Sequence, residues 1–175
     1  NLGRFDDSIQ ASLSARRRLD ELGEPVEAAR ALQNLALTYF VLGRYNEALE
    51  HLDQVRAAFL ADGRQRDAIL TELFTSDCLL QLRRFPEVLE KCRQVYRVFD
   101  QLGTRFEVSL AILNEAIAYA GLKRYDEALA ALGEAAKSFE AQSNPTWAAY
   151  ANLEAAQVLL RKAQYHASLR VAEAC

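Results

Sequence analysis

Apolar residues recur along the chain at the spacing of amphipathic helices. In residues 28–42, and again in residues 47–60, they stand three or four positions apart with polar residues between them. The same small and large side chains then return every forty residues. One column of small residues reads Ala31, Thr71, Ala111, Ala151. A fixed period of this length predicts a stack of helical hairpins that repeat one packing unit.

An aromatic residue marks a tight turn inside each repeat, usually after a leucine and a basic residue. This series reads Phe5, Tyr45, Phe85, Tyr125, Tyr165. A second series of turns carries the glycine expected in the left-handed region after a helix C-terminus, at Gly23, Gly63, Gly103. The residues expected to cap the second helices at their N-termini are Asp6, Asn46, Asp126.

These signals divide the chain into successive units of one repeat domain that covers residues 1–175. The expected units are a partial one at 1–23, three complete hairpins at 24–63, 64–103 and 104–143, and a partial one at 144–175 that is cut short in its second helix. The chain contains no Met, and it begins and ends within a repeat. We therefore expect it to be a piece of a longer protein.

The residues around the first turn resemble the tetratricopeptide repeat. Leu35-Ala36-x-x-Tyr39 is followed by Gly43-x-Tyr45 and by Ala48-x-x-x-Leu52, and the third unit keeps the same phrase. The resemblance implies an all-α fold, a right-handed α-solenoid of antiparallel helical hairpins. The period of forty, and the missing closing Pro, are similar to long-repeat arrays of bacterial regulators, of proteins with a caspase-like CHAT domain, and of kinesin light chain.

In tetratricopeptide arrays the first helix of each unit lines a concave face that takes up a peptide or a partner helix. The resemblance therefore implies partner binding by the variable columns of these helices. The expected partner-binding residues are Arg30, Gln33, Asn34, Leu37, Leu70, Leu73, Asp77, Leu110, Leu113, Asn114, Ile117, Tyr150, Leu153 and Gln157. Asn34 and Asn114 are equivalent, and such an amide can donate and accept at once, so each is a candidate for holding a peptide backbone.

The leucines of this set leave two interpretations open. As a groove, Leu73 and Leu113 would form an apolar interaction surface, and changing both to Asp would abolish partner capture while the helical content stays intact. As core, they would be turned between the helices, because a repeated leucine is more often packed than exposed. If the Asp variants unfold the protein, the groove interpretation of these leucines is wrong.

Composition and candidate chemistry narrow the function. The net charge of −3 provides no basic field for nucleic acid, and no apolar run is long enough to span a membrane. His51 and His166 lie far apart, and the three cysteines lack metal-ligand spacing. We therefore predict a cytoplasmic, non-enzymatic protein-binding scaffold without cofactor or metal. The alternatives are a regulatory arm of a larger bacterial signalling protein, and self-association through the exposed ends of the stack.

Overall fold

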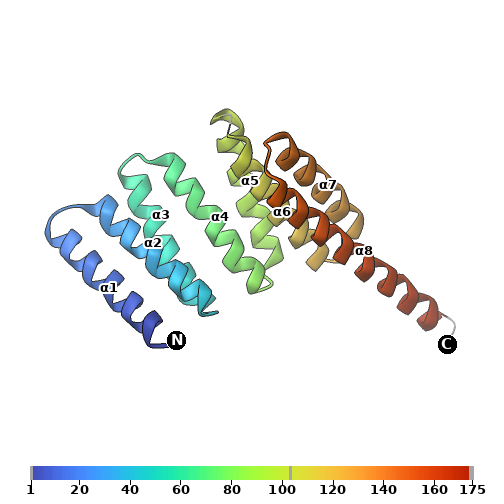
Figure 1. Cartoon of the computed structure of the whole chain (residues 1–175), viewed down its shortest axis with the longest axis horizontal. Coiled ribbons are helices and arrows are strands. Elements are labelled where there is room, and N and C mark those ends of the chain that lie inside the picture. Colours follow the sequence, from blue (N-terminus) through green and yellow to red (C-terminus); the bar gives the residue numbers. More distant parts are fainter. Residues whose placement is uncertain (1, 103, 174–175) are drawn as a thin grey trace. The chain divides into compact units, whose positions relative to one another are not determined.

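The computed structural model describes residues 2–102 and 104–173, with side chains for residues 5–99 and 104–165. Within these ranges the chain forms eight α-helices and no strand, which confirms the expected all-α fold (Figure 1). The chain divides into two compact units, Asn1–Leu82 and Arg83–Cys175. The single repeat domain expected over residues 1–175 stays a prediction, and each unit is described by itself.

The first unit is a succession of four helices in which each helix packs against the next. These are α1 (Leu2–Glu21), α2 (Pro25–Val41), α3 (Tyr45–Ala61) and α4 (Gln65–Gln81). Its core has two parts. Around Leu35 and Phe59 lies a cluster contributed by all four helices. A second cluster contains Ala36, Leu52 and Cys78, so the small Ala36 lets α2 approach its neighbours closely.

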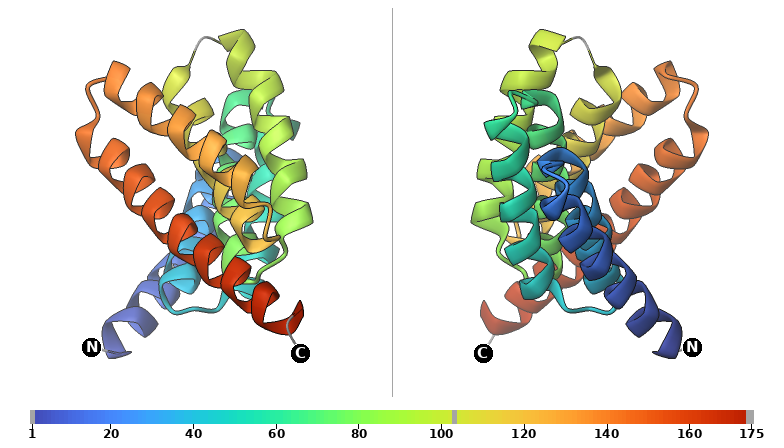
Figure 2. Two further views of the ribbon diagram at one scale, coloured as in Figure 1. Left: turned by 90° about the vertical axis from the view of Figure 1, so that its right-hand side faces the viewer. Right: turned by 90° about the vertical axis from the view of Figure 1, so that its left-hand side faces the viewer.

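The second unit continues the same arrangement with α5 (Phe85–Leu102), α6 (Arg105–Gly121), α7 (Tyr125–Ala141) and α8 (Pro145–Glu173). Figure 2 shows α7 and α8 as neighbouring antiparallel helices, and they pack on each other. Leu113, Leu132 and Phe139 are almost completely buried in its core. An aromatic cluster is attached to this core, because Trp147 stacks on Phe139 with ring centroids 5.8 Å apart.

The turns that the structure describes between helices place a left-handed residue at one common position, although the sequence predicted two kinds of turn. In the first, the N–H of Gly43 donates to the carbonyl of Phe40 and the N–H of Arg44 to that of Tyr39. This is the Schellman pattern, and it requires a left-handed residue. In the described turns, the left-handed residues at this position are Gly23, Gly43, Gly63, Arg83, Lys123 and Ser143. Gly103, expected in the same role, lies outside the described residues.

The expected N-caps are wrong. Helices α3 and α7 begin at Tyr45 and Tyr125, so Asn46 and Asp126 lie in the first helical turn, and Asp6 lies inside α1. The Schellman turn needs only three residues between helices, which makes the aromatic residue the first of the helix. Arginine occupies the cap position instead, and its side chain pairs with a carboxylate three residues later, as in Arg44 Nε to Glu47 Oε1 at 2.8 Å.

The expected turn before Tyr165 is also absent, because α8 runs without interruption to Glu173. Its counterparts α2 and α6 end at Val41 and Gly121, which are equivalent to Arg161. Ala163 occupies the position that is left-handed in the other turns. A left-handed conformation costs an L-residue with a Cβ about 1–2 kcal/mol, whereas alanine is the best helix former, so the helix continues.

Ser143 offers a test of the turn geometry, because it has a φ of 55°. We expect Ser143→Gly to stabilise the second unit by about 0.5–1 kcal/mol, since glycine removes the strain of the left-handed region but raises the entropy of the unfolded chain. The urea midpoint should rise with an unchanged slope. Ala130→Gly, at an exposed position inside α7, is the control and should lower stability by about 1 kcal/mol. A loss of stability in both variants would contradict the turn assignment.

Candidate partner-binding groove

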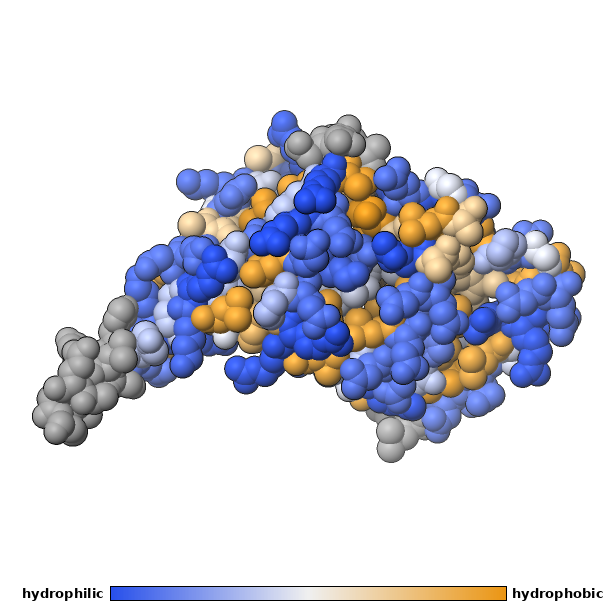
Figure 3. Space-filling model, turned by 180° about the vertical axis from the view of Figure 1, so that it is seen from behind, coloured by the Kyte–Doolittle hydropathy of each residue, from blue (hydrophilic) through white to orange (hydrophobic). Residues whose placement is uncertain are grey.

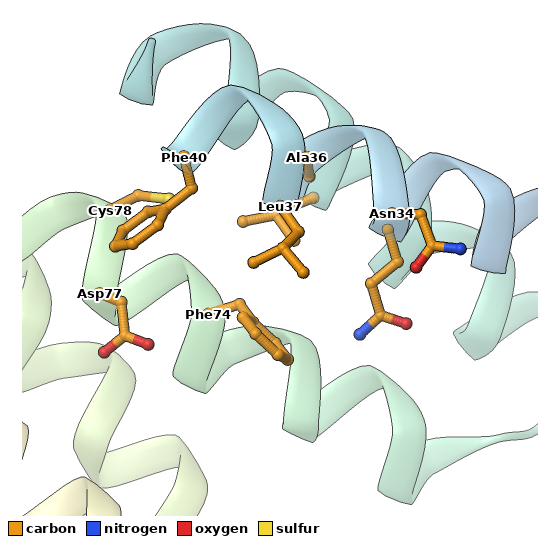
Figure 4. Close-up of a pocket in the computed structure, with 9 residues that line it drawn as sticks. Asn34, Ala36, Leu37, Phe40, Phe74, Asp77 and Cys78 are labelled. Carbon is orange, nitrogen blue, oxygen red and sulfur yellow. The ribbon is translucent and has the colours of Figure 1, made fainter. Parts of the chain in front are cut away.

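A pocket of about 170 Å³ opens between α2 and α4 in the first unit (Figure 4). Its lining side chains come from the first helices of two successive hairpins, with one contribution from α3. They are Gln33, Asn34, Ala36, Leu37, Phe40, Leu52, Phe74, Asp77 and Cys78. Six of the nine are apolar, so the pocket is suited to an apolar group with polar atoms beside it.

Helical spacing explains how these side chains converge. On α2, Gln33, Leu37 and Phe40 are separated by four and three positions, and they therefore share one face of the helix. On α4, Phe74 and Cys78 are four positions apart and face α2. In Figure 4, Leu37 and Phe74 lie on opposite sides of the pocket and point toward one another. Both remain exposed, so the entrance is open to solvent.

The floor of the pocket is buried and chemically inert. Ala36, Leu52 and Cys78 belong to one packed cluster of the core. Burial raises the pKa of the Cys78 thiol to about 12, and the neighbouring Asp77 carboxylate adds to this rise. The thiol therefore stays protonated at neutral pH and behaves as a small apolar group rather than a nucleophile.

The rim provides hydrogen-bonding groups. Asn34 is exposed, and its backbone carbonyl accepts a hydrogen bond from the Thr38 hydroxyl at 3.0 Å. Its side-chain amide makes no hydrogen bond to the described residues, so both its donor and its acceptor are available to a ligand. Gln33 and Asp77 also line the pocket, and Figure 4 shows Asp77 at the end away from Asn34.

The predicted residues of the first unit are thus only partly brought together. Gln33, Asn34, Leu37 and Asp77 line one pocket. Arg30 lies outside it and forms an exposed ion pair with Glu27, and Leu70 is half-buried. Leu73 is 7% exposed, so the expectation that it lines a groove is corrected: at this position the core interpretation holds.

In the second unit the correction is larger. Leu113 is 1% exposed and packs in the core with residues of α7 and α8, and Asn114 is also buried. Neither side chain can contact a ligand on the surface. Of the two equivalent asparagines, only Asn34 on α2 therefore remains a candidate for holding a peptide. Leu110 and Ile117 are half-buried against the same core.

The remaining predicted residues of the second unit lie on α8 and stay accessible to different degrees. Leu153 is 55% exposed, although it is equivalent to Leu73 and Leu113. Tyr150 is exposed as well, and its ring meets that of Trp147 at 5.9 Å. Gln157 is half-buried and accepts a hydrogen bond from Arg161.

Sequence reasoning missed the aromatic walls of the pocket. Phe74 occupies the column of Asn34 and Asn114, and Phe40 occupies a column that otherwise holds Leu80, Ala120 and Leu160. The available signal was the departure of Phe74 from its column, since an exposed aromatic residue at a variable position is typical of binding surfaces. On the face seen in Figure 3, apolar surface occurs in separate patches between hydrophilic side chains. Exposure alone therefore does not single out a site, whereas concavity does.

His51, one of the two histidines considered for catalysis, packs against an aromatic ring. The His51 ring stacks on Tyr39 at 5.4 Å, and burial, together with the positive charge of Arg16, lowers the pKa of His51. It is therefore neutral at pH 7. His166 and Cys175 lie outside the described side chains. In the described part of the chain, no group of His, Cys, Asp and Glu could hold a metal ion, and no helix has the length and hydropathy of a membrane span.

Comparison with known proteins supports the fold. Neither a protein-family model nor a curated protein matches the sequence. The structure is similar to the apo form of RapI, with a TM-score of 0.79 and 16% identity over 95% of this chain. It is also similar to a Rap protein complexed with Competence and Sporulation Factor, with a TM-score of 0.78 and 18% identity over 97% of this chain. The chain covers 46% and 47% of those two chains, less than half of each. At this identity the likeness shows a tetratricopeptide-like helical-repeat fold.

Proposed function

We propose that the protein is a non-enzymatic interaction scaffold that takes an apolar side chain of a peptide or partner helix into the pocket between α2 and α4. The observation that carries this proposal is the convergence of Leu37 and Phe74 on one open apolar pocket with amides at its rim. The similar Rap structure with a bound factor supports it, because a chain of this fold is found there in a complex.

The size of the pocket suits one large apolar side chain. Its volume is about 170 Å³, and an apolar protein cavity of about 150 Å³ is known to hold benzene. Full burial of a Leu or Phe side chain contributes about 1.5–3 kcal/mol. The amides of Gln33 and Asn34 would then pair with the backbone on either side of the inserted residue, which sets the direction of the bound chain.

A longer ligand would also contact residues outside the pocket. Arg30 on α2 and Leu70 on α4 do not line the pocket and would meet neighbouring residues of a longer ligand. Tyr150, Leu153 and Gln157 on α8 remain candidate contacts of their own. The forty-residue hairpins are those of a long-repeat array, which offers longer helices to a ligand than the ordinary thirty-four-residue repeat.

Phe74→Asp tests the pocket with a displayed library of random peptides as the probe. We expect the peptides enriched on the wild-type protein to share a large apolar residue and to bind the variant at least about a hundredfold more weakly. The physical reason is that the substitution removes one wall and buries a carboxylate against the ligand, an effect of roughly 3 kcal/mol. Fluorescence anisotropy of labelled peptides measures both affinities.

Leu60→Asp is the matched control, since Leu60 is an exposed leucine of α3 that does not line the pocket. It should leave peptide affinity within about twofold of wild type, which corresponds to less than 0.5 kcal/mol. Equal binding by wild type and Phe74→Asp would refute the pocket, and so would enriched peptides without an apolar residue.

A second candidate is a regulatory arm of a larger bacterial signalling protein, in which the same groove binds a ligand or the protein's own effector domain. The observation in its favour is that the similar Rap chains are more than twice as long as the part matched here. The coding sequence around this chain tests it. A caspase-like His/Cys pair, a phosphate-binding loop or a helix-turn-helix is the expected finding, and an open reading frame with repeats alone would contradict it.

A further inference from the structure

Three of the side chains that line the pocket between α2 and α4 depart from the forty-residue repeat. Gln33 stands where the other repeats have leucine. Phe74 replaces the asparagine of the first and third hairpins, and Asp77 replaces their leucine or isoleucine. The packing of the repeat therefore does not require these three residues. Their convergence on one pocket indicates that they serve what the pocket binds.

Asp77 is the one charged residue among the nine described residues that line the pocket. Its side chain is half-buried. Burial, and after it the negative charge of Asp77, raises the pKa of the Cys78 thiol to about 12, so this charge acts on the floor of the pocket. A partly buried carboxylate attracts a cation more strongly than an exposed one, because water and salt screen it less. The pocket thus places a site for a cation beside a site for an apolar group.

The amide and the carboxylate lie at opposite ends of the pocket. Figure 4 shows Asn34 at one end and Asp77 at the other. The apolar walls, Leu37 and Phe74, lie between them. Arg30 is four positions before Asn34 on α2, so by helical spacing it lies beyond the amide end. A basic side chain of a ligand is therefore attracted to the Asp77 end, since the other end carries the like charge of Arg30.

The amides of the pocket favour an extended ligand over a helical one. The backbone N–H and C=O groups inside a helix are bonded within that helix, which leaves little of its backbone for Gln33 and Asn34 to pair with. In an extended segment, side chains two positions apart lie on one face, separated by about 7 Å. Phe74 and Asp77 are three positions apart on α4, a rise of about 4.5 Å, and a flexible Lys or Arg side chain spans the difference.

We propose that the pocket binds an extended peptide segment in which a basic residue stands two positions from the large apolar residue. The apolar side chain lies between Leu37 and Phe74, and the basic side chain pairs with the carboxylate of Asp77. This inference rests on the proposed function, because it names the ligand class of the same pocket. An ammonium or guanidinium group forms charge-assisted hydrogen bonds to a carboxylate, whereas an acidic residue at that position is repelled.

Peptides selected on the wild-type protein from a displayed random library test the basic residue. We expect Lys or Arg to be enriched two positions from the shared apolar residue. In synthetic peptides with blocked termini, replacing this residue by Gln should weaken binding about tenfold, and replacing it by Glu should weaken binding further. Fluorescence anisotropy measures the affinities, and the advantage of the basic peptide should shrink as salt is added.

Variants of Asp77 test whether this carboxylate recognises the charge. Asp77→Asn should bind the basic peptide and the Gln peptide almost equally. Asp77→Lys should bind the Glu peptide better than the basic one, because the charges of the pair are exchanged. Asp53→Asn is the matched control, since Asp53 is an exposed aspartate of α3 that does not line the pocket, and it should keep the wild-type preference.

The outcomes separate this inference from the proposed function. Enriched peptides that share an apolar residue but no basic one would overturn the inference and leave the pocket as a binding site. A preference for the basic peptide that persists in Asp77→Asn would overturn it as well. Enriched peptides without an apolar residue would overturn both proposals. Binding of the Gln peptide by Asp77→Asn shows that this variant is folded, whereas Phe74→Asp should lose affinity for every peptide of the set.

Discussion

Leu113→Asp is expected to unfold the second unit, whereas Leu153→Asp is expected to leave it folded. The two leucines occupy the same column of the repeat, but Leu113 is 1% exposed and Leu153 is 55% exposed. Removing a buried leucine costs about 2–5 kcal/mol, and a carboxylate in the same space adds several more. This total is comparable to the whole stability of a typical domain, about 5–15 kcal/mol. At Leu153 the carboxylate remains in water, and the change should stay within about 0.5 kcal/mol.

Far-UV circular dichroism with urea titration measures the difference. Leu113→Asp should lose much of its helical signal before urea is added, and Leu113→Ala should keep the fold with a free energy of unfolding lowered by about 3 kcal/mol. Leu153→Asp should superimpose on wild type. A native spectrum and midpoint for Leu113→Asp would restore the groove interpretation of this leucine, which the sequence alone left open.

The periodic features of the chain were predictable because they arise locally. Amphipathic spacing places the helices, and a glycine such as Gly43 ends one because the left-handed turn needs it. The prediction failed at the turn that was expected before Tyr165. Ala163 is in the turn register, but it favours helix over a left-handed turn, so α8 continues past it.

The site was less predictable, because exposure depends on neighbours that a column of equivalent residues does not record. Alignment by period treats Leu73 and Leu153 as one position, although the first is buried and the second is exposed. It likewise treats Asn34 and Asn114 as a pair, although only Asn34 is at the surface. The pocket itself is formed by two helices whose equivalent residues are forty positions apart in the sequence. Phe74 forms one wall of the pocket, and it stands in the same column as Asn34 and Asn114, where the sequence suggested a peptide-binding amide.

The second large effect on stability is expected in the first unit, and it depends on a buried carboxylate of α4. Glu72 is fully buried, and Arg56 of α3 brings its Nε to 2.5 Å from the Oε1 of Glu72, close enough for an ion pair although without the alignment of a hydrogen bond. Arg56 itself is 41% exposed, so its charge is partly solvated while that of Glu72 is not. Because a buried charge depends on its counter-charge, the pair joins α3 to α4 beneath the surface.

Arg56→Ala is therefore expected to lower the free energy of unfolding of the first unit by about 3 kcal/mol, because it leaves the Glu72 carboxylate buried without this guanidinium. Arg30→Ala removes an exposed ion pair of the same unit and should cost less than about 0.5 kcal/mol. The double variant Arg56→Met and Glu72→Met removes both charges and should recover most of the loss, since apolar residues of similar volume replace a buried pair at little cost. Urea titration gives the free energy of unfolding of each of the four proteins. An Arg56→Ala protein as stable as Arg30→Ala would mean that other groups neutralise Glu72.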